Sequence, residues 1–151
     1  MPAEILSRHE KDLLIEQLKN RFGIEKLPYL LFKTGKEKIR AFSGHLSRDE
    51  LNTLFKTATV EIIGIYLVKE EKKNEARLSL DANHLLHEQI SKNIFILDEQ
   101  QAKKWMKGED IYVDKDLFGF YILKNDNDFM GCGKASQGRM INFIPKERRV
   151  R

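Results

Sequence analysis

The most specific pattern in the sequence lies near its end: Met130-Gly131-Cys132-Gly133-Lys134, followed by Gly138-Arg139-Met140-Ile141-Asn142-Phe143-Ile144-Pro145-Lys146. Short apolar runs such as residues 118–123 are typical of strands. Between them, Asn125-Asp126-Asn127-Asp128 favours a tight turn, because Asn and Asp tolerate the backbone angles that turns require. The pattern predicts a small, largely β barrel in the second half of the chain.

Gly131 and Gly133 flank a single residue within this predicted barrel. Two such glycines let another backbone come close, and that backbone could belong to a bound polynucleotide or to a corner of the barrel itself. Both interpretations stay open from the sequence. Cys132 between them is the one cysteine, so no internal disulfide can form. No histidine lies near it in sequence, and we do not expect it to act as a catalytic nucleophile.

The first helix is predicted from its start and its end. Ser7-Arg8-His9-Glu10 has the pattern of a capping box, in which two side chains satisfy backbone N–H groups at a helix N-terminus. Gly23 is expected to end the helix, because glycine adopts the left-handed conformation at little cost. The apolar face between these points consists of Leu13, Leu14, Leu18 and Phe22.

Three further elements complete the predicted first unit. Residues 29–32 and 39–42 read as two strands of a hairpin around a polar turn. Ser47-Arg48-Asp49-Glu50 repeats the capping-box pattern and predicts a second helix. Residues 60–68 are β-branched and apolar almost throughout, as expected of a strand that is covered on both faces.

The barrel is expected to contain one or two short helices as well as strands. Residues 93–97 are a strand candidate, and Asp98 is predicted to begin a brief helix that Gly108 ends. The sequence therefore predicts an α+β chain with a small α/β domain over residues 1–74 and a β domain over residues 75–151. No linker-like or low-complexity stretch separates the two.

The positive charge is concentrated at the C-terminus. The whole chain has a formal net charge of +4, but residues 134–151 carry six cations against one glutamate, so the preceding residues sum to −1. A nearly neutral body with a basic terminus is typical of proteins that bind nucleic-acid phosphates, although a solubilising tail has the same composition. We expect these cations to form one wall, and scattering or neutralisation by the protein's own carboxylates would contradict it. They are Lys134, Arg139, Lys146, Arg148, Arg149 and Arg151.

With these residues, the second half resembles the C-terminal PUA-like RNA-binding domain of the Sun-family RNA cytosine-5 methyltransferases. The resemblance covers about residues 75–151 and includes the Gly-Lys, Gly-Arg, Asn and Pro-Lys series quoted above. It implies a PUA-type pseudobarrel that binds structured RNA. Lys134, Arg139, Asn142 and Lys146 match the family's polar and basic series, whereas Cys132 replaces the family's usual aromatic residue.

A small α/β unit before a PUA domain is also similar in layout to the pre-PUA plus PUA factors of ribosome biogenesis. The resemblance thus implies a non-catalytic protein that binds rRNA or tRNA during maturation. The expected contacts are Lys134, Arg139, Asn142, Lys146, Arg148, Arg149 and Arg151, with backbone approach at Gly131 and Gly133. No cofactor is expected, because the Gly-rich Rossmann loop that binds S-adenosylmethionine is missing. The alternative is a protein-interaction module or accessory subunit that docks an RNA methyltransferase or a ribosomal protein.

Other function classes find little support. His84 and His87 lie three residues apart with Glu88 beside them, but a zinc site needs three or four ligands. The aromatic residues of the second half could stack on bases where exposed, although we expect most of them in the core. The longest apolar run, residues 62–68, is far too short for a membrane span, and the N-terminus lacks the pattern of a signal peptide. We therefore expect a cytoplasmic location.

Overall fold

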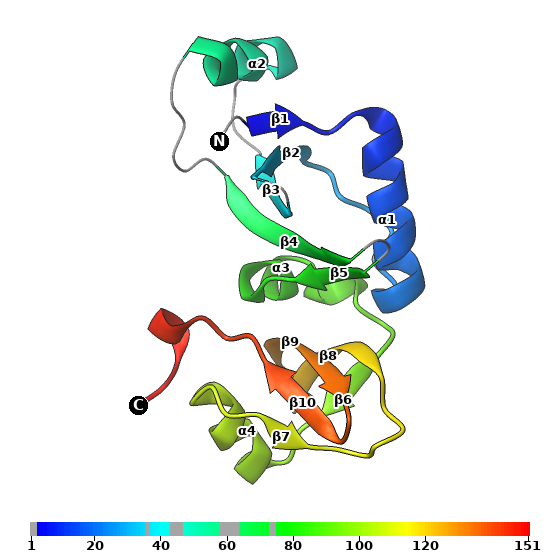
Figure 1. Ribbon diagram of the computed structural model, residues 1–151, viewed down its shortest axis with the longest axis vertical. Coiled ribbons are helices and arrows are strands. Elements are labelled where there is room, and N and C mark those ends of the chain that lie inside the picture. The colour runs from blue at the N-terminus through cyan, green and yellow to red at the C-terminus, as the bar shows by residue number, and fades with distance from the viewer. Residues whose placement is uncertain (1–2, 36, 43–46, 58–63, 73–74) are drawn as a thin grey trace.

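The computed structural model describes residues 3–35, 37–42, 47–57, 64–72 and 75–151, which form two five-stranded sheets with helices around them (Figure 1). This mixed α+β architecture confirms the predicted fold class. In chain order the elements are β1 (Ala3–Ile5), α1 (Arg8–Phe22), β2 (Leu30–Thr34), β3 (Lys38–Phe42), α2 (Arg48–Thr57), β4 (Ile65–Lys72), β5 (Glu75–Leu78), α3 (Leu80–Leu85), η1 (His87–Gln89), β6 (Ile94–Ile96), α4 (Glu99–Met106), β7 (Ile111–Tyr112), β8 (Gly119–Asn125), β9 (Asp128–Ser136), β10 (Arg139–Asn142) and η2 (Lys146–Arg148).

Helix α1 begins and ends where local sequence chemistry predicts. The Ser7 hydroxyl accepts from the Glu10 N–H at 3.1 Å, and the Glu10 carboxylate accepts from the Ser7 N–H at the same distance, which completes the capping box. Gly23 ends the helix with a φ of 85°. The predicted apolar face needs one correction: Leu13 is 46% exposed, because it lies about 100° around the helix from its buried neighbour Leu14.

The first sheet is an antiparallel meander in the order β1-β2-β3-β4-β5. The predicted hairpin is confirmed, with Leu30 opposite Phe42 and Thr34 opposite Lys38. The predicted strand over residues 60–68 is described from Ile65, and residues 60–63 lie outside the described part of the chain. Leu67 and Val68 are buried, but Ile65 is 45% exposed, so the described strand is not covered on both faces along its whole length.

The second sheet has the order β6-β8-β9-β10-β7, with β6 parallel to β8 and the other pairs antiparallel. Its hairpin between β8 and β9 turns at the predicted Asn-Asp segment, where Asp126 has a φ of 54°. Helix α4 begins at its Asp98 cap and brings the fully buried Trp105 onto the sheet. The sheet curls around a small core of its own, with α4 at the far end of the molecule (Figure 1).

A larger core joins the two sheets. Phe120, Ile122 and Cys132 of the second sheet belong to the same buried cluster as the apolar face of α1 and the strands of the first sheet. Helix α3 contacts both β4 and β9 and lies between the sheets (Figure 1). The first sheet also includes residues 75–78 as its last strand, so it extends beyond the predicted domain boundary at residue 74.

Arg21 of α1 adds a polar link across this junction. Its Nε donates to the carbonyl of Phe120 at 2.7 Å, and its Nη2 donates to that of Phe118 at 3.3 Å. The guanidinium carbon lies 5.0 Å from the ring centroid of Tyr121. In the other direction, the Asn93 side-chain amide donates to the carbonyl of Arg21.

No helix in the part of the chain described here has both the length and the apolar character of a membrane span.

We expect Arg21→Ala to lower the free energy of unfolding by about 1–3 kcal/mol, because it leaves the carbonyls of Phe118 and Phe120 without their charged donor. Urea denaturation followed by circular dichroism measures the change. Lys19→Ala is the matched control, since Lys19 is exposed on the same helix and its nearest carboxylate oxygen is 3.9 Å away. Equal stability of the two variants would show that Arg21 does not hold the sheets together.

Candidate functional site

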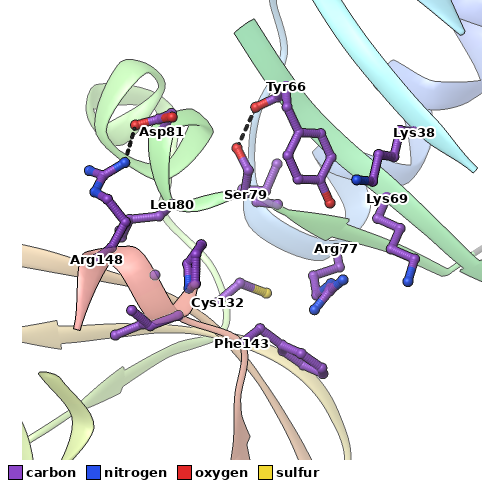
Figure 2. Close-up of a pocket in the computed structure, with 14 residues that line it drawn as sticks. Lys38, Tyr66, Lys69, Arg77, Ser79, Leu80, Asp81, Cys132, Phe143 and Arg148 are labelled. Carbon is purple, nitrogen blue, oxygen red and sulfur yellow. Dashed lines mark hydrogen bonds and ion pairs between the residues drawn. The ribbon is translucent and has the colours of Figure 1, made fainter. Parts of the chain in front are cut away.

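A cleft of about 290 Å³ opens between the two sheets. We call it the intersheet cleft. The first sheet lines it with Lys38, Lys69 and Arg77, and the C-terminal half lines it with Cys132, Phe143 and Arg148. Figure 2 shows the three cations of the first sheet on one side, the ion pair of Arg148 with Asp81 on the other, and Cys132 and Phe143 between them. Side chains far apart in the sequence therefore meet in one polar and apolar hollow.

Strand register places three cations side by side in this cleft. Lys38 is the Cα partner of Lys69, and Lys69 is the Cα partner of Arg77. Residues that share a register position point to the same face of a sheet, and adjacent strands lie about 4.8 Å apart. Like charges directly opposite each other repel. This cation row, Lys38-Lys69-Arg77, therefore forms a concentrated positive site that crosses β3, β4 and β5.

Carboxylates offset part of that charge. Lys69 Nζ lies 3.8 Å from a Glu37 oxygen and 4.0 Å from a Glu71 oxygen, which are ion-pair distances too long for good hydrogen bonds. Arg77 Nε is closer, at 3.2 Å from Glu71. The ammonium groups of the row therefore keep donor capacity for a further anion.

Aromatic rings orient two members of the row. The guanidinium carbon of Arg77 lies 3.9 Å from the ring centroid of Phe143, so this contact also joins the first sheet to the segment after β10. Lys38 Nζ lies 5.3 Å from the ring centroid of Tyr66. Burial raises the pKa of Tyr66, and the positive charge of Arg77 opposes that rise. The ring of Tyr66 thus remains a neutral wall for the cation beside it.

The structure pairs three of the predicted C-terminal cations with the protein's own carboxylates. Lys134 Nζ lies 3.8 Å from Glu75, Arg139 Nη2 lies 2.8 Å from Asp110, and Arg148 Nη1 lies 3.1 Å from Asp81. They also face different places, because Arg139 lines a hollow beside α4 and β7 while Arg148 lines the intersheet cleft. This arrangement differs from the single cationic wall expected from the sequence.

Two other predicted contact residues make structural hydrogen bonds. The Asn142 amide nitrogen donates to the carbonyls of Trp105 and Glu109 at 2.7 and 3.0 Å, and its oxygen accepts from the Ile144 N–H at 2.8 Å. Arg149 Nε donates to the carbonyl of Ile144 at 3.0 Å. These contacts hold the end of α4 and the C-terminal segment against β10.

Lys146 and Arg151 are the predicted cations that remain available. Both are exposed. Among the residues that the structure describes, no hydrogen-bond or ion-pair partner faces either side chain. Their ammonium and guanidinium groups can therefore meet a phosphate without first breaking an internal pair.

The two glycines have different surroundings. A Cβ on Gly133 would lie 2.7 Å from the Trp105 ring and 2.8 Å from Met140 Cγ, so the close approach at this position is made by the protein's own core. Gly131 has a φ of 98° and lines the intersheet cleft, where a Cβ would lie 3.4 Å from Leu80. Approach of a ligand backbone at Gly131 stays a prediction, whereas at Gly133 the space is filled.

Cys132 lines the cleft but is only 4% exposed. Burial raises the pKa of its thiol to about 12. Since the thiolate is the reactive form, this thiol is a poor nucleophile near neutral pH.

The paired histidines make local contacts. His84 Nε2 lies 3.0 Å from the carbonyl oxygen of Phe129, and His87 Nδ1 lies 2.8 Å from that of His84. The His87 ring also packs against Phe129 at 5.8 Å between centroids. Within the described ranges, no group of three His, Cys, Asp or Glu residues is placed to hold a metal ion.

We expect Gly133→Ala to destabilise the protein by about 1–3 kcal/mol, because the added methyl group overpacks the core around Trp105. Denaturant unfolding followed by tryptophan fluorescence measures the loss and reports on the same ring. Ser136→Ala on the same strand is the control. A Gly133→Ala variant as stable as the wild type would contradict the close packing.

Cys132 should react with iodoacetamide far more slowly in the folded protein than in urea-unfolded protein at pH 8. The folded thiol is almost fully protonated at that pH, because its pKa is about 12. Mass spectrometry of the alkylated protein measures the rates. A folded-state rate equal to the unfolded rate would mean that the thiol is accessible and activated.

Comparison with known proteins bears on the second sheet and on the whole fold. Residues 92–150 match the family model of the PUA domain of the methyltransferase RsmF, a range that runs from β6 through η2. A conserved PUA domain protein from Thermoplasma acidophilum shares the fold, with a TM-score of 0.61, 16% sequence identity and 93% of each chain covered. The search of curated proteins found no match. Residues 92–150 therefore resemble the PUA domain of the methyltransferase RsmF, and the α+β chain shares the fold of a PUA domain protein.

Proposed function

We propose that this protein binds structured RNA without catalysing a reaction, and that it acts on ribosomal or transfer RNA during maturation in the cytoplasm. The observation that carries the proposal is the PUA-like domain over residues 92–150, matched by a family model taken from a methyltransferase. PUA domains are associated with RNA binding. The proposal assigns that role to this domain together with the unit that precedes it.

Electrostatics supports RNA as the ligand. Lys146 is exposed and follows Pro145, which lines the intersheet cleft, and Arg151 is exposed after Val150, whose N–H donates to the carbonyl of Met106 at the end of α4. Each phosphate that such a cation neutralises releases counterions, so binding strengthens as salt falls. The closely paired Arg139 and Arg148 would add less, because phosphate must compete with Asp110 and Asp81, whereas Lys134 lies 3.8 Å from Glu75 and keeps donor capacity.

The chemistry of the described titratable groups supports a binding role rather than catalysis. The one thiol is protonated near neutral pH. The ring nitrogens of His84 and His87 that make contacts face backbone carbonyls. Neither group is paired with a partner that would activate it as a nucleophile or base.

A second function, docking of a modifying enzyme or a ribosomal protein, draws support from the exposed apolar side chains of the second half. Tyr112 is 86% exposed, Phe118 70% and Ile96 63%. Aromatic residues are enriched at protein interfaces. Purification separates the two functions, because nucleic acid that co-purifies and is removed by nuclease favours RNA binding.

We expect the wild-type protein to bind purified transfer RNA with an affinity that falls steeply with salt, and Lys146→Glu with Arg151→Glu to weaken it. Loss of two phosphate contacts should reduce the slope of log K against log salt by about 1.4–1.8. Filter binding at several salt concentrations measures both quantities. Lys19→Glu with Lys26→Glu changes the charge equally on α1 and the loop after it. Equal slopes for the two double variants would contradict the assigned surface.

A further inference from the structure

We propose that the intersheet cleft binds one unpaired nucleotide of the RNA. Its phosphate would lie against the cation row Lys38-Lys69-Arg77, and its base against the apolar wall around Phe143. The inference rests on the proposed RNA binding and deepens it. It makes the first sheet, outside the matched PUA-like domain, the source of the phosphate contacts.

The charge of the cation row favours a bound anion. Three positive side chains share one register position across adjacent strands, and their mutual repulsion is unfavourable. The two nearby carboxylates offset the charge of these three cations only in part. Glu71 lies 3.2 Å from Arg77 Nε, but the oxygens near Lys69 lie at 3.8 Å or more. A phosphate can accept hydrogen bonds from more than one ammonium group at once, and it relieves the repulsion across the row.

Arg77 is the fixed member of the row. Its side chain is 15% exposed and is held by Glu71 at 3.2 Å and by the face of Phe143 at 3.9 Å from the ring centroid. A guanidinium held this way loses little conformational entropy when it binds phosphate. The proposed phosphate site and the proposed base site are therefore adjacent, because the guanidinium of Arg77 belongs to the cation row and also contacts the ring of Phe143.

The opposite side of the cleft suits a base. Besides Ser79 and the ion pair of Arg148 with Asp81, the lining there includes the apolar side chains of Leu80, Phe143, Ile144 and Pro145, with Gly131 beside them. Aromatic and guanidinium faces are the surfaces on which unpaired bases stack. The cleft volume of about 290 Å³ is at the small end of the range for ligand pockets, so it fits a single nucleotide rather than a duplex.

Chain continuity argues for a nucleotide that belongs to the bound RNA. Pro145 lines the cleft, and Lys146, the next residue, is exposed outside it. An RNA strand on the exposed C-terminal cations therefore passes the mouth of the cleft. A free mononucleotide or an acidic peptide would not need exposed cations beside the mouth of the cleft. The test below includes each of these two ligands as a possible outcome.

The test uses the full-length protein and two RNA hairpins, one blunt-ended and one with three unpaired nucleotides at its 3′ end. We expect the wild type to prefer the tailed hairpin by about tenfold, the size of effect that stacking of one base gives. Lys38→Gln with Lys69→Gln should reduce that preference to about twofold or less, because the phosphate site is lost. Fluorescence anisotropy measures both affinities. The double variant should melt close to the wild-type temperature, because it removes both a like-charge pair and the long ion pairs of Lys69.

Lys19→Gln with Lys26→Gln is the matched control and should keep the full preference. The inference is overturned if the cleft variant also keeps it, or if the wild type binds both hairpins equally. In either case the proposed RNA binding stands. Failure of the wild type to bind any RNA would overturn both proposals. Two further results would reassign the cleft: AMP alone binding there without competition from the tailed hairpin, or a polyglutamate peptide binding there while RNA does not.

Discussion

The shared apolar core between the two sheets is the constraint on which the rest of the structure depends. Ile122 and Cys132 of the second sheet are buried in the same cluster as Leu18 and Phe22 of α1. Buried apolar side chains cannot shift without exposing surface to water, at about 25 cal/mol for each Å². The relative orientation of the sheets is therefore set by packing, and the intersheet cleft is the hollow that this packing leaves beside the core.

The parts of the fold that sequence predicts best are those fixed by neighbours in the chain. A capping box needs residues three apart, as at Ser7 and Glu10, and a tight turn needs residues such as Asp126 with an unusual backbone angle. The cation row depends instead on register between Lys38, Lys69 and Arg77, which are distant in sequence. The net charge of residues 1–133 does not indicate the cation row, because acidic residues elsewhere in this segment cancel the charge of these three cations.

The same limit explains the C-terminal cations. Sequence counts Arg139 and Arg148 as free charges, but Asp110 and Asp81 lie 29 and 67 positions away from them and meet them only in the folded chain. Asn142 matches a family-like series in the sequence, and in this structure its amide holds the end of α4. Regular alternation along a strand would place Gly131 and Gly133 on the same face. Their surroundings differ because Gly131 has a φ of 98° beside an irregular register between β8 and β9, which the sequence alone does not show.

The two sets of cations differ in a way that suits different steps of binding. Exposed residues such as Lys146 and Arg151 act through screened charge, and such charges raise the rate at which an anionic chain is captured. Arg77 is oriented before any ligand arrives, so it contributes to geometry rather than to capture. Salt should therefore weaken initial attachment more than it weakens discrimination between unpaired and paired nucleotides. That separation is what a protein needs if it is to find RNA by charge and select a site on it by shape.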